Sequence, residues 1–155
     1  MHPFFATRFK VTSDMLDQNG HVNNVVYVNW MQEVAIAHGK LAGFAGSLGT
    51  NSDVGWAARS HHIHYRHPAY LGDSVLAVTW IATTRRVGCQ RKYHFRLDPP
   101  NGESISVVEA ETDWVFVNRS NGRPTRIPSE SQQKIKVLPQ EPGMEEVQAF
   151  LATIR

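Results

Sequence analysis

One long apolar run constrains the fold of this chain more than any other feature. Residues 25–42 read VVYVNWMQEVAIAHGKLA, which is too long for a strand and carries apolar side chains on nearly every helical face. The run predicts one central, buried helix that is surrounded by protein. Asn23 or Asn24 can cap its start through a side-chain oxygen, and Gly39 or Gly43 can end it.

The rest of the chain has the composition and alternation of β-structure. Residues 4–12 favour a first strand, and four further candidates follow the apolar run, at residues 56–65, 73–84, 89–97 and 103–118. Gly88 and the run Asp98-Pro99-Pro100-Asn101-Gly102 supply turn chemistry between strands, so the later strands should pair antiparallel. An apolar helix needs a surface to cover it. We therefore expect an α+β fold, a curved antiparallel sheet wrapped around one long helix.

The last part of the chain reads as an extension of the same domain. A chain of 155 residues suits a single domain, residues 1–155, with a short C-terminal extension from about residue 128. Ser129 and Gln132 have capping-box spacing for a short helix, and PQEPG, residues 139–143, reads as a loose linker. One helix leaves the outer face or an edge of the sheet uncovered, so a homodimer or homotetramer is expected.

Composition and charge exclude several function classes. A formal net charge of +2 is too small to indicate a nucleic-acid partner, and no apolar run is long enough to predict a membrane span. The single Cys89 cannot form an internal disulfide, and the N-terminus has no signal-peptide core. These features predict a cytoplasmic protein.

A polar stretch, LDQNGHVNN at residues 16–24, stands directly before the apolar run. Its simplest interpretation is structural: a turn at Gly20 with an asparagine helix cap. The spacing also permits chemistry, because Asp17, Asn19 and His21 alternate just before helix amides that carry partial positive charge. The chain has no GxSxG motif, and Cys89 has no neighbouring histidine, so these features favour a carboxylate route for acyl transfer here.

These residues also carry a family resemblance. Residues 17–24, DQNGHVNN, followed by Tyr27, Trp30 and Glu33, resemble the signature of hot-dog-fold thioesterases, especially the 4-hydroxybenzoyl-CoA thioesterase-like and acyl-CoA thioester hydrolase group. They are also similar to the D-x-N-x-H-V-N-N segment of plant acyl-ACP thioesterases. The turn PAYLGDSV, residues 68–75, resembles the Pro-x-x-x-Gly-Asp turn of the family.

The resemblance implies roles for individual residues. Asp17 would attack the thioester carbonyl or activate water, Asn19 and His21 would orient the water or Asp17, and amides at the helix start near Asn24 would polarise the carbonyl. Tyr27 belongs to the signature and is expected to contact the substrate.

Glu33 has two interpretations. It is expected either to take a secondary role in the substrate site or to lie at a subunit contact. The family often places an arginine after this glutamate, whereas this chain continues Val34-Ala35-Ile36.

Two basic clusters remain. Arg85, Arg86 and Arg91 flank a hairpin turn, where they could serve solubility alone or, as the resemblance implies, hold the phosphates of CoA. Four histidines fall within residues 60–67, SHHIHYRH, but no third ligand accompanies a possible pair. We expect no metal and no cofactor, with these residues lining an interface or the mouth of the ligand site.

The resulting hypothesis is an acyl-CoA thioesterase that releases a free carboxylic acid and CoA. Plant acyl-ACP enzymes have an acidic residue where this chain reads Arg66-His67-Pro68-Ala69, which favours the CoA branch. The alternatives are an acyl-ACP thioesterase and a non-catalytic acyl-CoA-binding module on the same fold.

Overall fold

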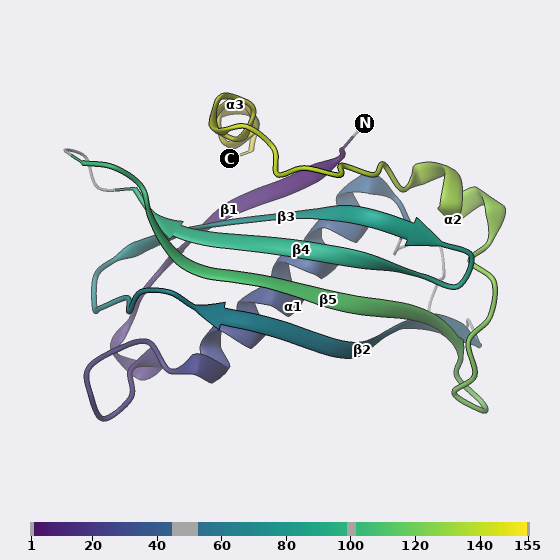
Figure 1. Cartoon of the computed structure of the whole chain (residues 1–155), viewed down its shortest axis with the longest axis horizontal. Helices are drawn as coiled ribbons and strands as arrows, with labels where there is room; N and C mark the ends of the chain where they lie inside the picture. Colours follow the sequence, from purple (N-terminus) through teal and green to yellow (C-terminus); the bar gives the residue numbers. More distant parts are fainter. Residues whose placement is uncertain (1, 45–52, 99–101, 155) are drawn as a thin grey trace.

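A computed structural model describes residues 2–44, 53–98 and 102–154 (Figure 1). A five-stranded sheet has the order β1-β3-β4-β5-β2, and every neighbouring pair in it is antiparallel. The elements, in chain order, are β1 (Phe4–Lys10), η1 (Ser13–Met15), α1 (Asn24–Ala42), β2 (Val54–Tyr65), β3 (Ser74–Arg85), β4 (Gly88–Leu97), β5 (Ile105–Asn118), α2 (Ser129–Lys134) and α3 (Met144–Thr153). The predicted α+β architecture, with one long helix crossing an antiparallel sheet, is confirmed.

An asparagine cap starts helix α1, and a glycine ends it. The Asn23 side chain accepts a hydrogen bond from the amide of Val25 at 3.1 Å, so Asn23 is the cap. Gly43, with a φ of 90°, ends the helix in the left-handed conformation that glycine tolerates, while Gly39 lies inside it.

Within a single chain, α1 is buried on one face only, and not on nearly every face as the apolar run indicated. Its inner face is buried against the sheet, but Val25 is 63% exposed and Ile36 is 50% exposed on the opposite face. The sheet covers only one side of a helix that lies on it, so the remaining apolar side chains stay open to solvent in one copy of the chain.

The main core lies between α1 and the concave face of the sheet. Alternate residues of β4, such as Tyr93 and Phe95, point toward Trp30 and Met31 of the helix. Phe9 of β1 stacks on Trp30 with a centroid distance of 4.7 Å. These contacts fix the start of α1, and the polar stretch before it, against the end of the sheet.

The C-terminal extension covers part of the outer face of the sheet (Figure 1). Helix α3 was not predicted from the sequence, yet Val147 of this helix is fully buried on β1 and β3. The cluster on this face comprises Phe4, Ala6, Leu76, Val78, Trp80, Ala82 and Val147, with Leu138, Met144, Phe150 and Leu151 packed against it. Strand β3 is consequently buried on both faces along most of its length.

Two details of the extension differ from the sequence predictions. Ser129 is the first residue of α2 rather than its cap, because Pro128 takes the cap position, and Gln132 instead donates a hydrogen bond to Thr84 at 2.9 Å. Residues 139–143 are not a loose linker, because Glu141 pairs with His94 on β4.

The turn predictions can be compared only in part. Strands β3 and β4 meet in a hairpin whose last pair is Arg85 and Gly88, as the glycine indicated. Of the run 98–102, residues 99–101 lie outside the described residues, although β4 and β5 do pair antiparallel.

Candidate active site

A tight turn holds the Asp17 carboxylate in one orientation. Its Oδ1 accepts hydrogen bonds from the backbone amides of Asn19 at 2.9 Å and His21 at 3.1 Å. The Asp17 amide donates to the His21 carbonyl at 2.7 Å, and Gly20 closes the turn with a φ of 77°. Within the described part of the chain, no hydrogen bond to the second carboxylate oxygen is seen.

Asp17 lines a cavity of about 240 Å³ at the N-terminus of α1. Three other predicted residues, His21, Asn24 and Tyr27, line the same cavity. Asn24 is the first residue of α1, so its amide has no acceptor within the helix, whereas the Val25 amide is taken by Asn23. A carboxylate and an available helix-start amide therefore meet in one pocket.

The end of β2 and the residues after it supply most of the remaining pocket wall, namely Tyr65, Arg66, His67 and Pro68. Val22, from the stretch before α1, completes the wall. The Tyr65 hydroxyl donates to the Asn24 carbonyl at 3.4 Å. His67 places Nδ1 2.7 Å from the Pro68 carbonyl, which can only accept, so Nδ1 carries the proton and Nε2 is the basic nitrogen. The sequence pointed to these residues only in general terms. It predicted that residues 60–67 line an interface or the mouth of the ligand site.

Several predicted site residues lie elsewhere. Asn19 contributes its backbone amide to the turn, but its side chain is not part of the cavity wall. Glu33 is exposed on the outer side of α1 and does not line the pocket. Arg85 pairs with Asp113 at 2.8 Å, and Arg85 and Arg86 line a separate basic cleft of about 340 Å³ at the hairpin end of the sheet.

The predicted exposed cluster that included Arg91 is wrong. Arg91 points inward from β4, is only 3% exposed, and donates to His38 Nδ1 at 2.9 Å and to Thr79 at 3.1 Å. Burial, and then the Arg91 charge, lower the pKa of His38 to about 3, so His38 is a neutral acceptor. Burial likewise lowers the pKa of Arg91. This arginine is part of the core and cannot reach a phosphate at the surface.

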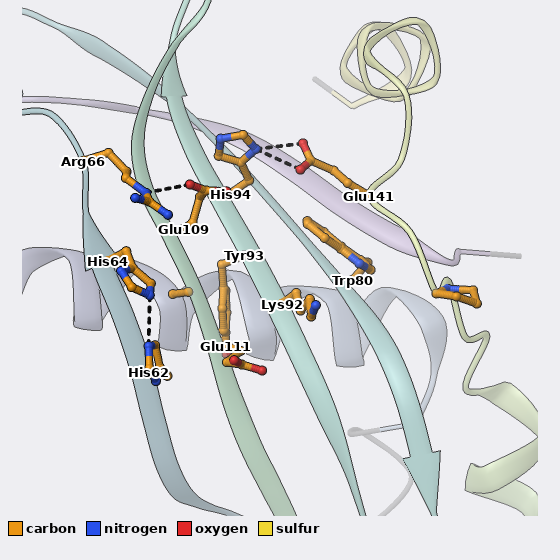
Figure 2. Close-up of a pocket in the computed structure, with 12 residues that line it drawn as sticks. His62, His64, Arg66, Trp80, Lys92, Tyr93, His94, Glu109, Glu111 and Glu141 are labelled. Atoms are coloured by element: carbon orange, nitrogen blue, oxygen red, sulfur yellow. Dashed lines mark hydrogen bonds and ion pairs between the residues drawn. The ribbon is translucent and has the colours of Figure 1, made fainter.

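A larger groove of about 350 Å³ lies on the outer face of the sheet (Figure 2). Two side-chain pairs lie along it: Arg66 with Glu109 at 2.8 Å, and His94 Nδ1 with Glu141 at 2.8 Å. His62 and His64 share a hydrogen bond between their Nε2 atoms at 3.0 Å. Arg66 also lines the Asp17 pocket, so the groove and the pocket meet at this residue.

No three histidine, cysteine, aspartate or glutamate side chains in the described ranges are arranged to hold a metal ion. Among the described helices, none combines the length and hydropathy needed to cross a bilayer.

The fold matches that of a solved thioesterase structure. The structure superimposes on that of a 4-hydroxybenzoyl-CoA thioesterase variant in complex with 4-hydroxybenzoyl-CoA, with a TM-score of 0.78 at 15% identity, over 86% of this chain and 99% of that one. The architecture is therefore the hot-dog fold of this thioesterase class, as the sequence predicted.

The sequence places the chain within that class. Residues 3–135 match the acyl-ACP thioesterase N-terminal domain, and the chain belongs to this family. It is 32% identical over 144 residues to acyl-acyl carrier protein thioesterase ATL3 of Arabidopsis thaliana, covering 86% of this chain and 68% of the relative. It is 27% identical over 148 residues to oleoyl-acyl carrier protein thioesterase 1 of the same plant, where 90% of this chain spans only 40% of the relative's length.

Proposed function

We propose that this domain hydrolyses acyl thioesters carried on phosphopantetheine, with Asp17 as the reacting carboxylate. The observation that carries the proposal is the turn at Asp17, which anchors one carboxylate oxygen and directs the group into a pocket beside the start of α1. A fixed carboxylate next to a donor of partial positive charge is the arrangement that acyl transfer requires.

Two routes use the same geometry. In the covalent route, Asp17 adds to the thioester carbonyl, the C–S bond breaks, thiolate leaves, and water hydrolyses the resulting anhydride to release the acid. In the general-base route, Asp17 takes a proton from water as the water oxygen adds to the carbonyl. The C=O bond then re-forms, the C–S bond breaks, thiolate leaves and the free acid remains. In both routes the Asn24 amide would hold the negative charge that develops on the carbonyl oxygen. His21 and Asn19 would support the turn that positions Asp17.

Thiol release from a panel of short, medium, long and aromatic acyl-CoAs tests the reaction. Asp17→Asn keeps an oxygen that can accept both turn hydrogen bonds but removes the charge, so we expect thiol release to fall by at least about 10³-fold with an unchanged melting temperature. Asp14→Asn is the matched control, because Asp14 lies on η1 outside the pocket wall. Equal activity of the two variants and the wild type would reject the role of Asp17. Ligand binding with no turnover of any ester would favour the binding-module alternative.

The carrier has two candidates. CoA was predicted from the sequence and carries the same arm as acyl carrier protein, whereas the family and the relatives above are named for carrier-protein esters. Competition between the same acyl group on CoA and on carrier protein, compared as kcat/KM, separates them. A ratio above about 100 in favour of either ester would assign the carrier.

The basic cleft cannot serve the pocket of its own chain. Eleven residue steps along β3 separate Ser74, at the Asp17 end, from Arg85, which is roughly 36 Å at the usual strand rise. This span exceeds an extended phosphopantetheine arm. A second copy could close it, because antiparallel pairing of two β2 edge strands would place the hairpin end of one copy beside the Asp17 end of the other.

We therefore propose a homodimer as the active unit. We also propose the cytoplasm as its location, because a single buried Cys89 that forms no disulfide suits a reducing compartment. Light scattering after size exclusion measures the mass in solution. A fully active monomer, or an Arg86→Gln variant with an unchanged KM for CoA esters, would refute the shared site.

A further inference from the structure

A serine, a histidine and a glutamate form a hydrogen-bonded triad on the outer face of the sheet. The Ser106 hydroxyl lies 2.9 Å from His94 Nε2, and His94 Nδ1 lies 2.8 Å from the Glu141 carboxylate. Burial raises the pKa of Glu141, but the hydrogen bonds and charges of His94 and Arg96 outweigh burial and lower it. The carboxylate is therefore charged and can only accept, so Nδ1 carries the proton and Nε2 accepts from the serine hydroxyl.

A β-bulge brings the serine to this face. Ser106 of β5 pairs with Arg96 of β4, and Val107 is an extra residue between this pair and the next. Strict alternation would place Ser106 on the inner face with the core residue Val108, whereas the bulge turns it to the outer face with His94. The backbone of the sheet, and not a chance side-chain rotation, therefore sets the contact between serine and histidine.

The groove of about 350 Å³ on this face gives a small molecule access to the triad. His94 and Glu141 form part of its wall, and Ser106, which is only partly buried, borders it through the bond to His94. Arg66 lies in the same wall, on the side of His94 away from Glu141 (Figure 2). It uses Nε for Glu109, the residue opposite His94 on β5, so its terminal nitrogens can donate to a carbonyl oxygen there.

We propose that Ser106, His94 and Glu141 form a second acyl-transfer site, which hydrolyses short-chain carboxylic esters of alcohols independently of Asp17. The inference goes beyond the proposed function, because it assigns another nucleophile, another substrate class and another face of the sheet. A nucleophile, a base and a carboxylate that orients the base are defined by their geometry and not by a sequence motif such as GxSxG. The size of the groove suits a small ester.

The reaction needs only these side chains, an ester and water. Ser106 Oγ adds to the ester carbonyl as its proton moves to His94 Nε2, and Arg66 donates to the carbonyl oxygen. The C=O bond then re-forms, the C–O bond to the alcohol breaks, and the alcohol oxygen takes the proton from His94. Water adds to the acyl-serine with the same proton transfers, which releases the carboxylic acid and restores the Ser106 hydroxyl.

Diisopropyl fluorophosphate tests the reactivity of Ser106, because it transfers its phosphoryl group to an activated serine oxygen as fluoride leaves. In the Asp17→Asn background, which removes the carboxylate of the other pocket, we expect one group per chain, located on Ser106 by peptide mass mapping. Adding Ser106→Ala should abolish the label, and adding His94→Gln should slow labelling at least about 100-fold. Ser104→Ala is the matched control, because Ser104 is exposed and lies two residues before Ser106, and it should leave the rate unchanged.

Hydrolysis of p-nitrophenyl acetate measures turnover at the same site. In the same background we expect a burst of p-nitrophenolate that approaches one equivalent per chain, followed by slower turnover as the acyl-serine is hydrolysed. Ser106→Ala should lose the burst with an unchanged melting temperature, and Arg66→Gln should slow it at least about tenfold. Every variant is assayed below its own unfolding transition, so a loss of stability is not mistaken for a loss of reactivity.

Absence of a label on Ser106, or a burst that survives Ser106→Ala, would overturn the second site and leave the triad as an anchor for the C-terminal extension. An unchanged burst in Arg66→Gln would overturn the role of Arg66 as the donor. Neither outcome depends on whether Asp17 hydrolyses thioesters, because all variants are compared in one background.

Discussion

Replacing Glu141 by glutamine should loosen the C-terminal extension from the sheet. The Glu141 carboxylate contacts His94 Nδ1 at 2.8 Å and Arg96 Nη2 at 2.9 Å, and the three side chains are 34%, 15% and 12% exposed. Hydrogen bonds to charged groups contribute about 1.5–3 kcal/mol when buried. Solvent screening of the partly exposed carboxylate reduces this value, so we expect a loss of about 1–2 kcal/mol in the free energy of unfolding at pH 7.

Urea unfolding of Glu141→Gln and wild type measures this difference. The control is Glu130→Gln, because Glu130 is 80% exposed and lies 3.9 Å from Lys134 on the same helix. The control should change the free energy of unfolding by less than about 0.5 kcal/mol. Equal midpoints for the two variants would refute the argument that Glu141 anchors the extension.

The pH dependence gives the sign of the Glu141 interaction. Burial alone would raise the pKa of Glu141, but the hydrogen bonds and charges of His94 and Arg96 outweigh burial and lower it below the ordinary value of 4.5. The folded state thus binds this proton more weakly than the unfolded state. The stabilisation is complete above pH 4.5 and is lost as the pH falls through the folded-state pKa. The gap between wild type and Glu141→Gln should therefore close in acid, and a constant gap from pH 7 to pH 3 would contradict this origin.

Three further outcomes test other parts of the fold. Asn23→Ala should lower the free energy of unfolding by about 1 kcal/mol, measured by urea titration, because it removes the cap of α1. His38 has a folded-state pKa lowered to about 3 from 6.5, so on acidification the unfolded state takes up this proton before the folded state does. The free energy of unfolding of wild type should therefore fall as the pH drops below 6.5, and that of His38→Gln should not show this fall. Burial raises the pKa of Cys89 to about 11, so a thiol reagent at pH 8 should label it only after denaturant is added.

The elements that the sequence predicted well are those with a long or repeated pattern. The apolar run of α1 and the alternation of five strands extend over many residues, so local exceptions do not change the outcome. Helix α3 was missed although its signals were present. Val147, Phe150 and Leu151 have helical spacing, and Glu146 accepts a hydrogen bond from the Gly143 amide at the start. A short amphipathic helix is stabilised by the surface that it covers, and the sequence does not display that surface.

The candidate site likewise contains residues that the sequence predicted well and residues that it did not. Asp17, His21 and Asn24 are close in sequence, so one turn brings them together and a local motif can predict the pocket. The prediction that Arg91 lies in an exposed basic cluster was wrong because alternate residues of a strand point to opposite faces of the sheet. Cys89, Arg91, Tyr93 and Phe95 share the inner face of β4, so the apolar neighbours at positions i±2 were the signal that Arg91 points into the core.

The C-terminal extension also limits how copies of this chain can assemble. Helix α3 and the segment before it already bury the outer face of β1 and β3, so a second copy could reach that part of the face only by displacing Val147 and its neighbours. Strand β2, at the other edge of the sheet, has no such cover from the described residues, and its residues 60–65 are mostly exposed. Assembly by sheet extension at β2 leaves the extension undisturbed. We therefore expect Phe150→Ala, which weakens α3, to lower thermal stability while leaving the solution mass unchanged. A change in mass would mean that the extension itself forms the contact between copies.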